Sequence, residues 1–124
     1  MVSRPLVAVV DDDQSVRESL PDLLREFGFD AQAFASPEAF LRSAFVERAD
    51  CLLLDIAMPG MSGPDLQQVL SHNLRAIPIV FITALADQSV RARVLAAGAV
   101  DCLFKPFTDT ALLRAVTAAL QTSS

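Results

Sequence analysis

Several residue types are scarce or absent in this chain. It contains no tryptophan and no tyrosine, one histidine, His72, and two cysteines, Cys51 and Cys102, without CxxC spacing. These residues are too few for a His/Cys metal site, and we expect both thiols to be buried and reduced. No run of Lys and Arg is present either. Without basic runs or stacking Trp and Tyr side chains, the sequence argues against direct nucleic-acid binding.

Long hydrophobic runs are also missing. The most apolar stretch, IPIVFITALA at residues 77–86, is too short to cross a bilayer. The N-terminal residues MVSRPLVAVV lack the apolar core and cleavage site of a signal peptide. We therefore expect no membrane association and, by default, a cytoplasmic location. The 124 residues are 52% hydrophobic and 20% charged, with a net charge of −5, which predicts one globular domain over residues 1–124.

Short apolar runs alternate with helical patterns along the whole chain. Three runs are almost continuously apolar, as is typical of central parallel strands buried on both faces. The more polar run AQAF predicts an edge strand. Five β-α units predict an α/β fold with a doubly wound, five-stranded parallel sheet and right-handed crossovers. Strands are expected at 6–10, 31–34, 51–55, 78–82 and 100–104, and five helices at 15–27, 37–44, 64–72, 88–97 and 109–120.

Helix starts are marked by local signals. Ser15 and Glu18 have the spacing of a capping box. Ser36-Pro37 and Gly63-Pro64 each place a proline at the first expected helical position. Pro21 falls inside the first expected helix, and we expect it to kink that helix or shift its start.

Polar residues of complementary chemistry stand at the ends of four expected strands. Asp11–Asp13 follow the first strand, Asp55 ends the third, Thr83 follows the fourth and Lys105 follows the fifth. Because the carboxyl ends of parallel strands share one edge of the sheet, these side chains should meet. Clustered carboxylates repel one another and favour a hard divalent cation, Mg²⁺ or Mn²⁺. The remaining ammonium and hydroxyl groups fit a phosphoryl group.

The stretches VAVVDDD, LLLDIAMPGMSG, FITA and FKPF together resemble the receiver domain of response regulators in two-component signalling. The resemblance covers essentially the whole chain. It implies the flavodoxin-like strand order 2-1-3-4-5. It also implies that a sensor histidine kinase donates a phosphoryl group from its phosphohistidine. Such a domain catalyses only its own phosphorylation and slow dephosphorylation, and is not otherwise an enzyme.

The resemblance assigns roles to individual residues. Asp55 resembles the phosphoacceptor, and Thr83 and Lys105 resemble the hydroxyl and the ammonium that contact the phosphoryl group. The acidic pair Asp11 and Asp12 resembles the metal-holding pair. The implied magnesium ligands are Asp11, Asp12, Asp55 and the backbone carbonyl of Ala57, and the Lys105-Pro106 bond is similar to the cis peptide of the family.

Two features depart from the family pattern. Cys102 stands where the family has its switch aromatic, three residues before the lysine. A thiol is smaller than an aromatic ring and cannot make the same inward-outward movement, so the response should rest on Thr83 and the backbone. Ala57 and Leu85 occupy the positions that tune phosphoryl lifetime. Neither side chain can orient a water, which predicts slow to moderate self-dephosphorylation, with Leu85 shielding the phosphoryl group.

Alternatives remain for the molecule as a whole. The runs AGAVDCLFKPF and DTALLRAVTAAL resemble receivers of transcriptional regulators that carry a helix-turn-helix output domain. A stand-alone receiver and a receiver-like interaction module that is not phosphorylated are the other interpretations. A phosphatase of the haloacid-dehalogenase type, using Asp11 and Asp13, is a remote alternative, because it gives Asp55 no role.

The last expected helix carries more apolar residues than one buried stripe requires. Leu112, Val116 and Ala119 suit the core, whereas Leu113 and Leu120 lie off that line. Packing against the sheet is one explanation. The other is a contact surface, formed by the fourth helix, the fifth strand and the last helix, for a homodimer or an output domain.

Overall fold

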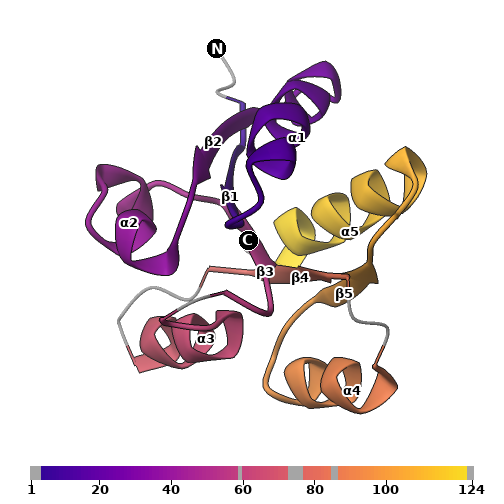
Figure 1. Cartoon of the computed structure of the whole chain (residues 1–124). Coiled ribbons are helices and arrows are strands. Elements are labelled where there is room, and N and C mark those ends of the chain that lie inside the picture. Colours follow the sequence, from indigo (N-terminus) through magenta and orange to yellow (C-terminus); the bar gives the residue numbers. More distant parts are fainter. Residues whose placement is uncertain (1–3, 59, 73–76, 85–86, 123–124) are drawn as a thin grey trace.

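One parallel sheet with the strand order β2-β1-β3-β4-β5 organises the chain (Figure 1). The computed structural model describes residues 4–58, 60–72, 77–84 and 87–122. The observed strand order confirms the predicted α/β fold and the order 2-1-3-4-5. It also confirms that the polar second strand lies at an edge of the sheet. The strands are β1 (Leu6–Val10), β2 (Asp30–Phe34), β3 (Cys51–Asp55), β4 (Ile79–Thr83) and β5 (Asp101–Phe104).

Helices cover both faces of the sheet. Figure 1 shows α1 and α5 on one face and α2, α3 and α4 on the other. This is the arrangement that lets the central strands be apolar on both sides. The helices are α1 (Gln14–Glu26), α2 (Pro37–Leu41), α3 (Gly63–His72), α4 (Gln88–Ala96) and α5 (Asp109–Thr122), and a 3₁₀ helix, η1 (Ala44–Glu47), follows α2.

Alternate residues of the strands supply two separate apolar cores. Val9 and Leu53 pack with Leu112 and Val116 of α5, and their neighbours along the strands pack with α2, α3 and α4 on the other face. Every residue of β3 and β4 is buried. The two rigid central strands thus fix where their carboxyl ends lie.

The predicted capping box at Ser15 is wrong. Asp13 is the N-cap of α1, and its Oδ1 accepts a hydrogen bond of 2.9 Å from the Ser15 backbone N–H. Aspartate is as good a cap as serine, and Asp13 directly precedes the first residue of α1. Pro21 is buried within α1 and does not shift the start of the helix.

The helix expected over residues 37–44 is shorter than predicted. Ser36 caps α2 as expected, but α2 ends at Leu41. The Ser43 hydroxyl donates to the carbonyl of Phe40 and accepts from the N–H of Phe45, so that it caps η1 instead of extending α2. Other boundaries move by one or two residues, and Thr83 is the last residue of β4 rather than the residue after it. No helix in the described ranges is long and apolar enough to span a bilayer.

Candidate functional site

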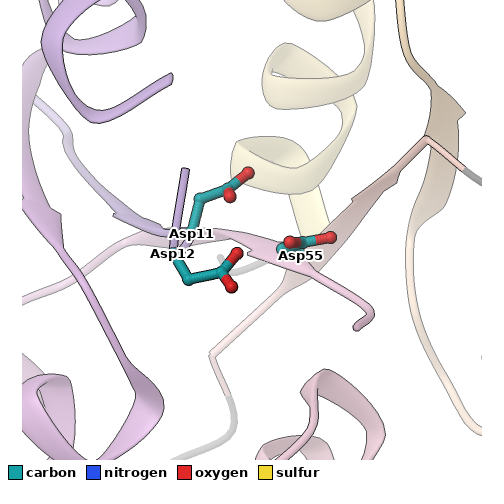
Figure 2. Close-up of side chains that lie close together, drawn as sticks. All are labelled: Asp11, Asp12 and Asp55. Atoms are coloured by element: carbon teal, nitrogen blue, oxygen red, sulfur yellow. The ribbon is translucent and has the colours of Figure 1, made fainter. Parts of the chain in front are cut away.

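Three aspartates converge at the carboxyl edge of the sheet. Asp11 and Asp12 follow β1, and Asp55 ends β3. The parallel register pairs Val10 with Leu54, so the residues after them come side by side. One carboxylate oxygen from each aspartate lies within 4.8 Å of the others. Figure 2 shows the Asp11 and Asp12 side chains extending from the end of β1 towards Asp55.

Asp11 is fully buried, and each of its polar groups has a partner. Its N–H donates to the carbonyl of Phe34, and its own carbonyl accepts from Arg17 Nη1 at 3.0 Å. Its Oδ1 accepts from the backbone N–H of Asp13 at 2.9 Å, and its Oδ2 from Lys105 Nζ at 2.8 Å. A buried carboxylate is costly unless it is paired and hydrogen-bonded, and Asp11 meets both conditions.

Lys105 brings the positive charge to this edge. It follows β5, and its backbone N–H donates to the carbonyl of Thr83 at 2.7 Å. The Lys105–Pro106 peptide bond is cis. Burial disfavours the ammonium, but the hydrogen bond to Asp11 and the charges of Asp11 and Asp55 outweigh it and raise the pKa of Lys105. The lysine therefore stays charged at any physiological pH.

Asp55 lies in a different environment, although it is only 7% exposed. Burial, followed by the negative charge of Asp11, raises the pKa of Asp55 to about 6, while Lys105 and a hydrogen bond from the Ala57 backbone oppose this rise. Asp55 thus has less compensation for its charge than Asp11 has. A cation or an electrophile at this carboxylate would relieve the imbalance.

The donor set of the cluster fits a hard divalent cation. The cluster offers only carboxylate oxygens, and one ammonium partly offsets the charge of three carboxylates. Carboxylates whose oxygens lie within 4.8 Å of each other repel by roughly 3.5 kcal/mol per pair at an effective dielectric of about 20. Oxygen-only ligands of this charge suit Mg²⁺ or Mn²⁺ better than a soft metal.

Other predicted site residues lie along the same edge. Thr83 is buried at the end of β4, beside Lys105 through the backbone bond described above. Ala57 is exposed in the loop two residues after Asp55. Leu85, the predicted shield of the phosphoryl group, lies outside the described residues.

Both cysteines are buried free thiols, as predicted. Burial raises the pKa of Cys51 to about 12 and also raises that of Cys102, so neither thiol is activated. Cys102 belongs to the core that faces α2, α3 and α4, and Phe104 packs against that same core. The aromatic ring nearest Lys105 in sequence therefore shares a face with Cys102 but not its position.

Two supporting residues were missed in the sequence. Arg17 holds the carbonyl of Asp11 from α1. Gly63 brings α3 against the end of β3, because a Cβ atom there would lie 2.4 Å from the Asp55 carbonyl oxygen. In the sequence, the Gly63-Pro64 pair indicated only the start of a helix. Nothing in the sequence around Arg17 indicated that its side chain would bind the Asp11 carbonyl.

Asp13 does not join the cluster. Its Oδ1 caps α1 by accepting from Ser15, and the group of potential metal ligands in the described residues consists of Asp11, Asp12 and Asp55. The phosphatase alternative needs Asp11 and Asp13 as its working pair. The geometry instead groups Asp11 with Asp12 and Asp55.

Comparisons with known proteins agree with this geometry. The family model of the response regulator receiver domain matches residues 7–117. The chain is 43% identical over 119 residues to Nodulation protein W of Bradyrhizobium diazoefficiens, which covers 96% of this chain and 52% of that protein. It is 39% identical over 110 residues to the transcriptional regulatory protein FixJ of Rhizobium meliloti, covering 89% of this chain and 54% of the relative.

Solved structures give the same result. The response regulator StyR superposes with a TM-score of 0.88 at 47% identity, covering 98% of this chain and 61% of that one. The structure named FixJ-N superposes with a TM-score of 0.85 at 36% identity, covering 97% and 96% of the two chains. The chain spans about half the length of the curated relatives that it matches.

Proposed function

Because the chain belongs to the family of response regulator receiver domains, we propose that Asp55 accepts a phosphoryl group from the phosphohistidine of a sensor histidine kinase. The observation that carries this proposal is the convergence of Asp11, Asp12 and Asp55 at one sheet edge with Lys105 bound beside them. Three carboxylates and one ammonium provide a nucleophile, a cation site and a donor to phosphoryl oxygens.

The chemical step uses Asp55 as an oxygen nucleophile. An Asp55 carboxylate oxygen attacks phosphorus in line with the leaving nitrogen of the phosphohistidine. One P–O bond forms as the P–N bond breaks, and the histidine nitrogen takes a proton from solvent. The Lys105 ammonium, held within 2.8 Å of Asp11, donates to the transferred oxygens and offsets their charge. The domain catalyses this step on itself and is proposed to have no other enzymatic activity.

Asp11, Asp12, Asp55 and the carbonyl of Ala57 are the proposed ligands of Mg²⁺ or Mn²⁺. When bound, the ion neutralises charge on the phosphoryl oxygens. Asp12 is the exposed member of the acidic pair and Asp11 the buried one. Asp12 can therefore turn towards an ion without breaking a structural contact, whereas Asp11 must share its carboxylate with Lys105.

The signal is proposed to arise from added charge. A phosphoryl group adds about 1.5 to 2 negative charges to a site that already holds three carboxylates. A shift of the Thr83 hydroxyl and the backbone after β4 towards the phosphoryl group then becomes favourable. Cys102 is too small to repeat the movement of an aromatic ring, so this route relies on Thr83.

The complete protein is proposed to be a transcriptional response regulator in the cytoplasm. Support comes from relatives such as FixJ, whose name describes a transcriptional regulatory protein, and from the half of their length that this chain spans. The proposed partners are a sensor histidine kinase and either an output domain or a second copy of the chain. Nucleic-acid contacts are assigned to the output domain and not to this segment.

A phosphorylation assay tests the proposal. Incubation with acetyl phosphate and Mg²⁺ should add the mass of one phosphoryl group, and Asp55→Asn should abolish the gain. Asp22→Asn, which changes an exposed aspartate of α1, serves as the matched control and should label like the unchanged protein. Label that persists in Asp55→Asn would overturn the assignment.

An unphosphorylated interaction module is the second candidate, favoured by Cys102 at the switch position. It keeps the fold and predicts no mass gain under any of these conditions. A kinase phosphorylated on histidine, supplied as donor in place of acetyl phosphate, extends the comparison to the proposed partner class.

A further inference from the structure

Glu38 is a charged residue whose position the proposed function does not explain. It lies in the first turn of α2, and its Oε2 accepts a hydrogen bond of 3.5 Å from the backbone N–H of Met61. Its Oε1 is buried and is the one buried side-chain oxygen without a hydrogen-bond partner in the described part of the chain. Burying a carboxylate oxygen in this way costs free energy, which calls for a reason.

The helix dipole is not a sufficient reason. An acidic residue in the first turn of a helix is stabilised by the positive end of the dipole. That stabilisation is also available to a side chain that points into solvent. It therefore explains why residue 38 is acidic, but not why its carboxylate turns inward onto the loop between β3 and α3.

Glu38 contacts this loop at Met61 and lies close to Gly60. Besides the bond to Met61, a Cβ atom built on Gly60 would come within 3.1 Å of Glu38 Oε2. Gly60 has φ of +76°, a conformation that glycine adopts without strain. Glycine at position 60 thus lets the loop pass close to the Glu38 carboxylate.

The loop carries Ala57, a proposed metal ligand, between two anchors. On the β3 side, the Ile56 N–H donates to the carbonyl of Ile82 at 3.2 Å, and the Ile56 carbonyl accepts from Gly63 at 3.0 Å. On the α3 side, the Met61 N–H donates its hydrogen bond to Glu38 Oε2. The Ala57 backbone itself hydrogen-bonds to Asp55, and the Met61 contact holds the loop four residues further on.

We propose that Glu38 is a positioning residue that holds the β3–α3 loop so that the Ala57 carbonyl faces the metal site. This inference rests on the proposed metal site. Glu38 does not belong to the cluster of potential ligands in the described residues, and it acts through the backbone of the loop. For this role the length of the Glu38 side chain, which lets it accept from the Met61 N–H, matters more than its negative charge.

Two conservative variants separate reach from charge. Glu38→Gln keeps the length and an acceptor oxygen but loses the charge, whereas Glu38→Asp keeps the charge but is one methylene shorter. Mn²⁺ affinity is measured from the electron paramagnetic resonance signal of free Mn²⁺, and the melting temperature is recorded in parallel without metal. Glu47→Gln and Glu47→Asp, at an exposed position of η1, are the matched controls.

Glu38→Asp should weaken Mn²⁺ binding about tenfold, as is typical when a group supporting a metal ligand is lost. Glu38→Gln and both Glu47 variants should stay close to the unchanged protein. Equal affinity in Glu38→Asp and the unchanged protein would overturn the inference, as would greater weakening in Glu38→Gln than in Glu38→Asp. If Asp12→Asn loses Mn²⁺ binding while Glu38→Asp keeps it, the metal site stands and only the role of Glu38 fails. Absence of Mn²⁺ binding by the unchanged protein would overturn both.

Discussion

At the scale of single residues, Asp11 and Lys105 form the structural half of the site. Asp11 is 0% exposed as a side chain and Lys105 is 21% exposed, with 2.8 Å between Oδ2 and Nζ. Removal of one partner from such a pair leaves the other charge buried and uncompensated. The pair therefore supports the fold before any ligand arrives.

A double-mutant cycle measures this pair. In metal-free buffer, Lys105→Met should lower the free energy of unfolding by about 2 kcal/mol, because it removes a charge-assisted bond from buried Asp11. The same change in an Asp11→Asn background should cost clearly less, since residue 11 then has no buried charge to leave unpaired. Asp22→Asn, which removes the charge of Asp22 from its exposed pair with Arg25, should change stability little. Equal losses for Lys105→Met in both backgrounds would show that the two groups do not interact.

Asp55 should make stability depend on pH in the opposite sense to an ordinary paired aspartate. Its pKa is about 6 in the folded protein against an ordinary value of 3.8. As pH falls from about 6 towards 3.8, the folded state takes up the proton before the unfolded state does, so stability rises. Above pH 6 both states carry the charge, and the folded protein bears the full destabilisation.

Asp55→Asn should remove this dependence. In metal-free buffer above pH 7, the variant should be more stable than the unchanged protein by an amount on the order of 2 kcal/mol, and the gain should vanish towards pH 4. Urea unfolding at several pH values measures it. A constant difference across the range would exclude Asp55 as the titrating group.

At this scale the sequence predicted residues that the fold brings to one edge of the sheet, but not the residues that support them. Asp11, Asp55, Thr83 and Lys105 stand at strand ends, where residue type and topology together indicate their convergence. Glu38 contacts a loop 23 residues further along the chain. No periodicity or short motif encodes such a contact, which depends on the packing of two elements.

At the scale of elements, errors arose where a local side-chain bond competes with a helix. Asp13 caps α1 ahead of Ser15, and Ser43 separates η1 from α2. The strand cores were predicted closely because apolar runs mark buried segments directly. Ends of elements depend on which of several adjacent polar side chains reaches the backbone, and the sequence offers more than one.

Gly63 shows how one residue sets the distance between two elements. A Cβ at this position would lie 2.4 Å from the Asp55 carbonyl oxygen and 2.9 Å from Phe81 Cε1. Gly63→Ala should therefore push α3 away from β3, lower stability by about 2 kcal/mol and weaken Mn²⁺ binding. Gly28→Ala, at a left-handed glycine with open space around it, should lower stability without changing Mn²⁺ affinity. Unchanged Mn²⁺ binding in Gly63→Ala would show that the metal site does not depend on the position of α3.

At the scale of the whole molecule, the parallel sheet could be predicted from the alternation of strands and helices, whereas its strand order was implied by the resemblance to receiver domains. Alternating strands and helices require parallel pairing, and right-handed crossovers distribute the helices over both faces of the sheet. The observed order β2-β1-β3-β4-β5 then places the ends of β1 and β3 side by side at the centre. What this segment contacts in the complete protein is not encoded in that topology.

A phosphorylation-dependent dimer through α4, β5 and α5 is the prediction that belongs to the whole molecule. Leu112, Val116 and Ala119 of α5 are buried, whereas Leu113 is half-buried and does not belong to that stripe. On α4 and β5, Arg91 pairs with Asp101 at 3.4 Å on a partly exposed surface. In such an interface Leu113 would belong to the apolar part and the Arg91–Asp101 pair to the polar rim.

Analytical ultracentrifugation with beryllofluoride and Mg²⁺ measures this association. The loaded protein should sediment as a dimer and the unloaded protein as a monomer, if the phosphoryl mimic shifts the end of β4 towards the site as proposed above. Leu113→Glu should keep the loaded protein monomeric, since it places a charge in the contact. Gln32→Glu adds the same charge on exposed edge strand β2 and should leave the dimer intact. If the loaded protein stays monomeric, the dimer prediction is wrong, and an output domain is left as the proposed partner of this face.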